Sequence, residues 1–284
     1  MNSDILQKEL DEFLDSLNYL PPLKPVPAKI LKLLKSSDIN IKKLSKLIEK
    51  DPSLTTNILK HCNSPYYGFT SKISSINHAI SLIGINEVKK LTLIYAVRSR
   101  FKNNLEGYGI SGEQVFRHSL NTAIGAQFLA RLKRIHPIDM AFTAGILIDI
   151  GKIALNEFIV KYDIKEFKDK NNIPRLHEIE KQLLGLTHSE IAAILLHKWE
   201  FSDDITDAIA NHHYPSQANF NRKLSSILHV SDLIGIFNEY SFDITEYETT
   251  FDPFALQSLN LKFHDIKDLM DIMLEEMENP EFYI

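Results

Sequence analysis

The sequence predicts an all-α protein. Apolar residues recur three and four positions apart along nearly every long segment, which places them on one face of a helix. The alternation of apolar and polar residues that marks a half-buried strand is absent from every long segment of the sequence. Only 10 of the 284 residues are glycine and 44% are hydrophobic, as in ordinary globular proteins with a large core.

The first hundred residues predict short helices. Residues 1–19 are predicted to form an amphipathic helix, whereas the four prolines from Pro21 to Pro27 should keep residues 20–27 extended. Asp51-Pro52 is a strong helix start, because the carboxylate can cap the first turn and proline suits its first position. The predicted helices lie near residues 30–34, 41–48, 51–63, 75–83 and 86–101.

Longer helices follow a linker at residues 102–112, which holds Asn103, Asn104, Gly107 and Gly109. The predicted ranges are 113–133, 137–161, 174–185, 188–199, 203–213 and 222–239, then an acidic segment and a helix at 264–277. The predicted parts are an N-terminal helix (1–19), a basic helical lobe (20–102), a second helical lobe (111–240) and a C-terminal acidic segment with a helix (241–284).

Charge divides unevenly along the chain. Residues 20–102 carry 15 Lys/Arg against 4 Asp/Glu (+11), whereas residues 103–284 carry 16 against 28 (−12). The simpler interpretation is that the two lobes attract each other or that lysines cover solvated faces. The alternative is that the basic lobe binds an acidic protein or a phosphate-bearing ligand. The best candidates for such a contact are Lys89, Lys90, Arg98 and Arg100.

Several function classes are disfavoured. The net charge of −5 argues against bulk nucleic-acid binding, and no apolar run approaches the ~18 residues that span a membrane. The single cysteine, Cys62, excludes an internal disulfide and a cysteine-based zinc cluster. Together with an acidic N-terminus unlike a signal peptide, these observations predict a cytoplasmic protein.

Asp149 is the first candidate for chemistry. It lies in residues 142–152, where almost nothing else is polar, and a buried unpaired carboxylate costs several kcal/mol. Asp149 therefore needs a cation, a network of donors or a metal, and Lys152 is the simplest partner.

Other ionisable residues also share helical faces with apolar or small neighbours. They are His118, His188, His212, His213 and Asp232. Two carboxylates and several imidazoles facing one core suit a divalent transition metal better than calcium. Their spacing leaves open a shared metal site and separate structural roles.

At these residues the sequence resembles the HDOD family, the HD-related output domain of bacterial signal-transduction proteins. The resemblance spans residues 18–235. Its N-terminal strings are Leu20-Pro21-Pro22, Asp51-Pro52-Ser53-Leu54-Thr55, Asn63-Ser64-Pro65-Tyr66-Tyr67-Gly68, Ile73-Ser74-Ser75-Ile76, Ala79-Ile80 and Leu82-Ile83-Gly84. Its later strings are Phe116-Arg117-His118-Ser119, Ala144-Gly145-Ile146-Leu147, Gly151-Lys152, His188 and His212-His213.

The resemblance implies an HD-domain-like helical bundle in two lobes, the second similar to metal-dependent phosphohydrolases. Those enzymes hold metals through a histidine, an adjacent His-Asp pair, later histidines and a final aspartate. By position, His118 corresponds to the first histidine, Asp149 to the aspartate of the pair and Asp232 to the final aspartate. The later histidines correspond to His188, His212 and His213. The histidine of the pair is replaced by Ile148. The Gly-Tyr-Pro signature of the cyclic-di-GMP phosphodiesterase branch is also missing, since Tyr214-Pro215-Ser216-Gln217 follows His213.

Isoleucine has no lone pair, so the metal ion assigned to His118, Asp149 and Asp232 loses a ligand at position 148. Asp149 with the three later histidines could still hold one Zn²⁺, Fe²⁺ or Mn²⁺. Two-metal hydrolysis needs both ions.

The sequence therefore predicts a non-catalytic regulatory module that requires no cofactor and binds an unidentified signalling protein. The alternatives are a weakened single-metal phosphohydrolase acting on a nucleotide or cyclic dinucleotide, and nucleic-acid binding by the basic lobe.

Overall fold

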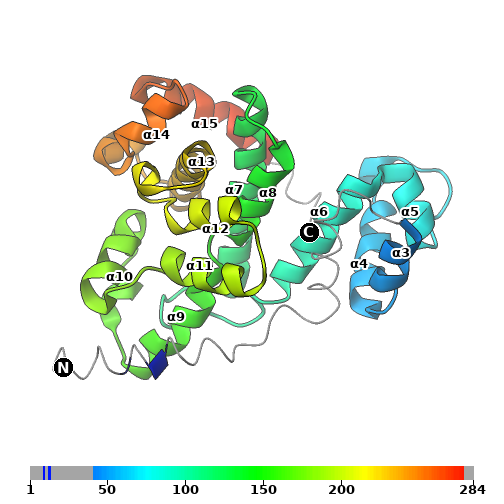
Figure 1. Ribbon diagram of the computed structural model, residues 1–284, viewed down its shortest axis with the longest axis horizontal. Helices are drawn as coiled ribbons and strands as arrows, with labels where there is room; N and C mark the ends of the chain where they lie inside the picture. Colours follow the sequence, from blue (N-terminus) through cyan, green and yellow to red (C-terminus); the bar gives the residue numbers. More distant parts are fainter. Residues whose placement is uncertain (1–8, 10–11, 14–40, 278–284) are drawn as a thin grey trace. The chain divides into compact units, whose positions relative to one another are not determined.

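The computed structural model describes residues 9, 12–13 and 41–277 (Figure 1). The proline-rich stretch, the predicted helix at 30–34 and most of the predicted helix at 1–19 lie outside these residues. The described residues are helical with connecting turns and contain no strand, only an isolated bridge between Leu105 and Ile110. The all-α prediction is confirmed. The described residues divide into two compact units, residues 41–100 and residues 101–277 with 9 and 12–13.

The unit formed by residues 41–100 contains short helices. They are α3 (Ile41–Ile48), α4 (Pro52–Cys62), η1 (Pro65–Tyr67), α5 (Ile76–Ile83) and α6 (Ile85–Arg98). Asp51 caps α4 by accepting a hydrogen bond from the Leu54 amide at 3.0 Å. The Asn63 side chain holds the next loop, since its amide donates to the Ile73 carbonyl and its oxygen accepts from the Ile73 amide, both at 2.8 Å.

The candidate partner-binding cations lie on α6 or just after it. Lys89, Lys90, Arg98 and Arg100 are all half-buried. Lys90 pairs with Glu87 at 3.0 Å, and burial lowers the pKa of Arg100. Their role in binding a partner stays a prediction.

The unit formed by residues 101–277 contains the longer helices. They are α7 (Gly112–Leu132), α8 (Ile138–Leu147), α9 (Ile150–Lys161), α10 (Leu176–Leu184), α11 (His188–Lys198), α12 (Asp203–Ala210), α13 (Arg222–Tyr240), α14 (Pro253–Ser258) and α15 (Phe263–Met277). Short 3-10 helices connect them: η2 (Lys165–Lys168), η3 (Lys170–Arg175), η4 (Pro215–Gln217) and η5 (Ile244–Thr250).

Helix α13 is the central element of this unit. Helices α7, α8, α12 and α14 all contact it, and Figure 1 shows it nearly end-on among them. Fourteen of its 19 residues are buried, including the polar His229 and Asp232. A helix buried on every side places polar side chains inside the protein, where each one needs a partner.

The predicted single helix at 137–161 is wrong, because the chain breaks between α8 and α9 at Ile148 and Asp149. Asp149 has φ −101° and ψ 8°, outside the helical region. Gly145 lies so close to α7 that an added Cβ would be 2.5 Å from the Ala123 Cα, and Gly151 touches α11 in the same way. We attribute the break to these two contacts, because α8 and α9 must approach different neighbours.

Helix α12 ends earlier than predicted. The predicted range 203–213 stops at Ala210, so His212 and His213 lie in a turn rather than on a helix. Among the residues from 41 to 277, no helix is both long and apolar enough to cross a membrane.

Candidate metal centre

The six predicted metal-site residues come from five parts of the unit formed by residues 101–277. His118 is on α7, Asp149 at the break between α8 and α9, and His188 at the start of α11. His212 and His213 follow α12, and Asp232 is on α13. All are buried except His213, which is half-buried. The structure gathers them into two neighbouring groups.

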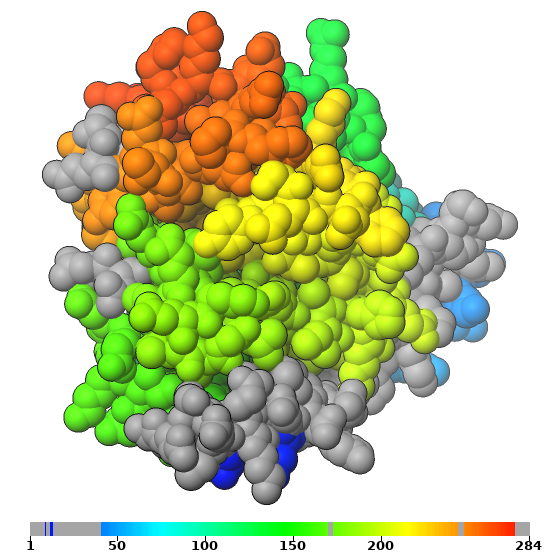
Figure 2. Space-filling model, turned by 60° about the vertical axis from the view of Figure 1, so that its left-hand side comes forward, coloured from blue at the N-terminus to red at the C-terminus, as the bar shows by residue number. Residues whose placement is uncertain are grey.

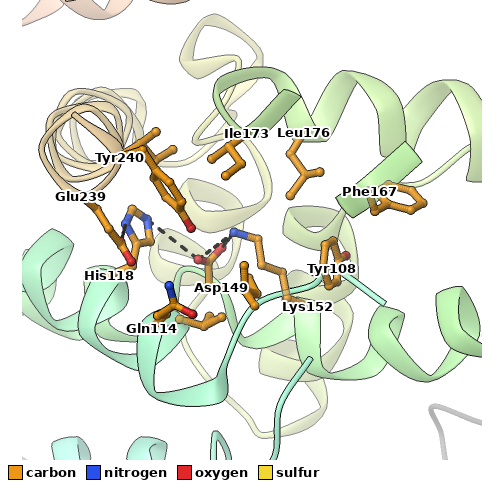
Figure 3. A pocket seen from close by; sticks show the side chains of 13 residues that line it. Tyr108, Gln114, His118, Asp149, Lys152, Phe167, Ile173, Leu176, Glu239 and Tyr240 are labelled. Carbon is orange, nitrogen blue, oxygen red and sulfur yellow. Dashed lines mark hydrogen bonds and ion pairs between the residues drawn. The ribbon is translucent and has the colours of Figure 1, made fainter. Parts of the chain in front are cut away.

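The first group is the ion-pair cluster, which consists of His118, Asp149, Lys152 and Asp232. The Lys152 ammonium lies 2.8 Å from each oxygen of the Asp149 carboxylate. His118 Nε2 lies 2.9 Å from Asp232 Oδ1. The same nitrogen lies 3.9 Å from Asp149 Oδ2 (Figure 3). His118 Nδ1 lies 3.7 Å from Glu239 Oε2. Both nitrogens of this imidazole therefore face carboxylates.

These pairs shift the pKa values of the cluster toward its charged forms. Burial alone raises the pKa of Asp149, but Lys152, His118 and His188 together bring it below its ordinary value. Burial lowers the pKa of His118 and of Lys152, yet the neighbouring carboxylates bring both above their ordinary values. The charges of Asp149 and Asp232 thus favour the protonated forms of Lys152 and His118.

Ile148, next to Asp149, is fully buried. Its hydrocarbon side chain provides no ligand atom at the position where the resemblance implies a histidine. The ion-pair cluster therefore contains a single imidazole, that of His118.

The second group is the histidine cluster, which consists of His188, His212 and His213. One ring nitrogen from each lies within 4.8 Å of those of the other two. His213 Nε2 is 3.2 Å from His188 Nε2, and the His212 and His213 ring centroids are 3.8 Å apart. Asp149 Oδ1 is 3.5 Å from His188 Nε2, but both oxygens of Asp149 contact Lys152. The structure thus brings together three of the four residues predicted to share one ion.

The histidine cluster fits a divalent transition metal. His212 Nδ1 lies 2.7 Å from the Ile209 carbonyl, which can only accept, so Nδ1 carries the hydrogen and Nε2 a lone pair. Nε2 is buried and has no hydrogen-bond partner among the described residues. A buried nitrogen of this kind is costly unless something binds it. Three imidazoles whose ring nitrogens converge suit Zn²⁺, Fe²⁺ or Mn²⁺, and His188, His212 and His213 would hold the ion.

Sequence reasoning missed several supporting residues. His177 stacks on His213, with ring centroids 3.9 Å apart and planes 7° from parallel. His229 Nδ1 donates to the His212 carbonyl at 2.8 Å, and its Nε2 accepts from the Asp252 amide at 2.8 Å. Ser225 donates to the Asn211 carbonyl at 2.8 Å. Two side chains of α13, one turn apart, therefore hold the turn that carries His212 and His213.

Glu180 was also missed, although the sequence carries a signal for it. It lies between Leu176 and Leu184 at a spacing of four, and all three residues are buried on α10. The same pattern, a carboxylate on an apolar helical line, singled out Asp149 and Asp232.

Buried imidazoles make stability depend on pH. Burial lowers the pKa of His177 to about 3 and that of His212 to about 4. In the unfolded chain each of these imidazoles takes up a proton near its ordinary pKa of 6.5. Their contribution to the free energy of unfolding is therefore complete above pH 6.5 and is lost as the pH falls toward 4 and then 3.

We expect His177→Gln to reduce the loss of stability between pH 6.5 and pH 5, by up to about 1.4 kcal/mol per pH unit. The measurement is urea unfolding with a chelator present. The matched control is His78→Gln, because His78 is exposed on α5 and should leave the slope unchanged. Equal slopes in wild type and His177→Gln would contradict the assignment.

A small pocket of about 40 Å³ opens onto the ion-pair cluster. At its centre in Figure 3 lie Lys152, Asp149 and His118, and its walls include Tyr108 and Tyr240.

Figure 2 shows another face of the molecule, where residues near 200–220 (yellow) lie between α11 (yellow-green) and the C-terminal helices (orange).

The family model of the HDOD domain matches residues 20–215. The chain belongs to the HDOD domain family. The match covers residues of both units and includes every predicted site residue except Asp232. Helices α13 to α15 lie beyond it.

Two curated relatives are bacterial proteins of uncharacterised function. One, from Treponema pallidum (strain Nichols), is 24% identical over 204 residues, which are 70% of this chain and 38% of the relative. The other, YuxH from Bacillus subtilis (strain 168), is 31% identical over 157 residues, which are 55% of this chain and 36% of YuxH. The chain thus spans less than two fifths of the length of either relative.

Solved structures share the HDOD fold. An HDOD domain protein with unknown function from Geobacter sulfurreducens has a TM-score of 0.72 at 19% identity, with 98% of each chain covered. A protein described as "Putative phosphohydrolase" from Shewanella amazonensis has a TM-score of 0.71 at 21% identity, covering 96% of this chain and 98% of that one. A "Putative signal transduction protein" from Marinobacter aquaeolei has a TM-score of 0.72 at 20% identity, covering 98% of this chain and 64% of that one. At these identities the likeness establishes the fold alone.

Proposed function

We propose that this HDOD chain is a regulatory interaction module in bacterial signal transduction that does not catalyse phosphohydrolysis. The observation that carries this proposal is the buried Ile148 beside Asp149. At that position the related hydrolases supply an imidazole to the metal ion that His118, Asp149 and Asp232 would otherwise hold.

The ion-pair cluster supports the same conclusion. The Lys152 ammonium contacts both oxygens of Asp149, and His118 pairs with Asp232. A divalent cation at this position would have to displace the Lys152 ammonium from Asp149 and His118 from Asp232. Two-metal hydrolysis requires both ions to activate water and stabilise the leaving oxygen. The binding partner in this proposal is a signalling protein, and the cations on and after α6 remain its predicted contact.

We expect the purified protein to show no turnover of nucleotides or cyclic dinucleotides in the presence of Mn²⁺, Mg²⁺, Fe²⁺ or Zn²⁺. The measurement is product formation by chromatography, with Asp149→Ala as the matched background. Metal-dependent turnover that Asp149→Ala abolishes would reject the non-catalytic role.

The second candidate function is a weakened single-metal phosphohydrolase. The unpartnered Nε2 of His212 favours it, because the nitrogen is buried beside two other imidazoles. A bound ion would supply Lewis acidity to a phosphate ester. Elemental analysis of protein purified without a chelator tests its first requirement, and protein without a transition metal removes this candidate.

A further inference from the structure

Glu180 is a fully buried carboxylate that joins the pocket wall to the histidine cluster. Its exposed fraction is 0%. Oε1 accepts a hydrogen bond from the Tyr108 hydroxyl at 2.8 Å. Oε2 accepts from both the backbone amide and Nδ1 of His188, each at 2.7 Å. Three donors converge on one carboxylate, which offsets the cost of burying it.

These bonds determine which nitrogen of His188 carries hydrogen. A carboxylate oxygen only accepts, so Nδ1 must donate, and in the neutral imidazole Nε2 then keeps its lone pair. His188 Nε2 lies 3.2 Å from His213 Nε2 and 3.5 Å from Asp149 Oδ1. In the other tautomer, a lone pair on Nδ1 would face the carboxylate oxygen at 2.7 Å, and the two would repel.

Tyr108 supports the carboxylate from the opposite side. It is 3% exposed, and its ring packs edge-on against Phe167 with centroids 5.7 Å apart. Burial and the charge of Glu180 raise the pKa of Tyr108 well above its ordinary value, so the hydroxyl keeps its proton. The pocket that opens onto Lys152 is also lined by Tyr108. A series of hydrogen-bonded side chains therefore leads from the pocket to the histidine cluster through Tyr108, Glu180 and His188.

We propose that Glu180, held by Tyr108, is the positioning residue that makes His188 a metal ligand through Nε2 and sets the affinity of the histidine cluster for a divalent transition metal. A carboxylate that accepts from the far nitrogen of a ligating histidine orients the ring and increases its basicity. This inference rests on the histidine cluster and is independent of whether the chain hydrolyses any substrate.

The first test measures Zn²⁺ binding by the full chain in competition with a chromophoric chelator. Zn²⁺ that is lost in His212→Ala is assigned to the histidine cluster. We expect Glu180→Gln to weaken this binding about 10- to 100-fold, because glutamine keeps the shape and one acceptor but removes the charge. Tyr108→Phe should weaken it less, because Glu180 and His188 remain bonded.

The matched control is Glu178→Gln on the same helix, because Glu178 is exposed. It should bind Zn²⁺ like the wild type. A Glu180→Gln affinity within about twofold of the wild type would overturn the inference, as would a wild-type protein without Zn²⁺ at this site. Absence of Zn²⁺ from the wild-type protein would leave the non-catalytic role of the chain intact, since turnover is measured separately.

A second measurement needs no variant at this position. Long-range ¹H–¹⁵N spectra of the metal-free wild type report which ring nitrogen of each histidine is protonated. We expect His188 to be protonated at Nδ1, and a spectrum showing its hydrogen on Nε2 would overturn the inference. This readout separates tautomer control from a purely structural role of Glu180.

Discussion

Lys152→Met should lower the free energy of unfolding by about 3–5 kcal/mol, because it leaves a buried charge without its partner. Asp149 is 1% exposed, and both of its oxygens lie 2.8 Å from the Lys152 ammonium. Methionine has a similar length and flexibility, so the lost packing is small and the lost charge dominates. The measurement is equilibrium unfolding in urea at pH 7.

The matched comparison is the double variant Asp149→Asn with Lys152→Met. It removes both charges, so it should recover a large part of the stability, and the cycle of four proteins isolates the pair. The loss of unfolding free energy caused by Lys152→Met should also become smaller as the pH falls toward 4, because burial and Asp232 then favour a protonated Asp149. A double variant as unstable as Lys152→Met alone would show that the loss comes from packing.

Gly151→Ala should destabilise the protein by about 3 kcal/mol, at the upper end of what added volume usually costs. A Cβ at this position would lie 1.9 Å from the His188 carbonyl oxygen and 2.8 Å from the Ala192 amide nitrogen. Both atoms belong to the backbone of α11, so no side chain can rotate away and the two helices must separate. The measurement is again urea unfolding.

The control is Glu157→Ala, because Glu157 is exposed on the same helix and alanine there only raises helix propensity. It should leave stability within about 0.5 kcal/mol of the wild type. Separation of α9 from α11 should also move His188, so Gly151→Ala should weaken Zn²⁺ binding at the histidine cluster. Stability equal to that of the wild type would mean that α9 and α11 lie farther apart than described.

The sequence by itself determined the helical class and the location of the unusual polar residues. Periodicity is a local property, so apolar stripes predict helices without any knowledge of their neighbours. A carboxylate within such a stripe must be buried with a partner, which is why Asp149, with Lys152 three residues away, could be singled out. Identifying Ile148 as a departure also required only the order of residues along the chain and the HDOD pattern.

Only the tertiary structure decided how these residues meet. The break at Asp149 accompanies contacts that Gly145 and Gly151 make with two different helices, and no local pattern records such contacts. The same holds for Glu180, whose three donors come from residues 72 positions before it and 8 after it. Spacing along the chain shows which face of a helix a residue occupies. Which nitrogen faces which oxygen depends on where separate helices cross, and packing of the whole unit determines that.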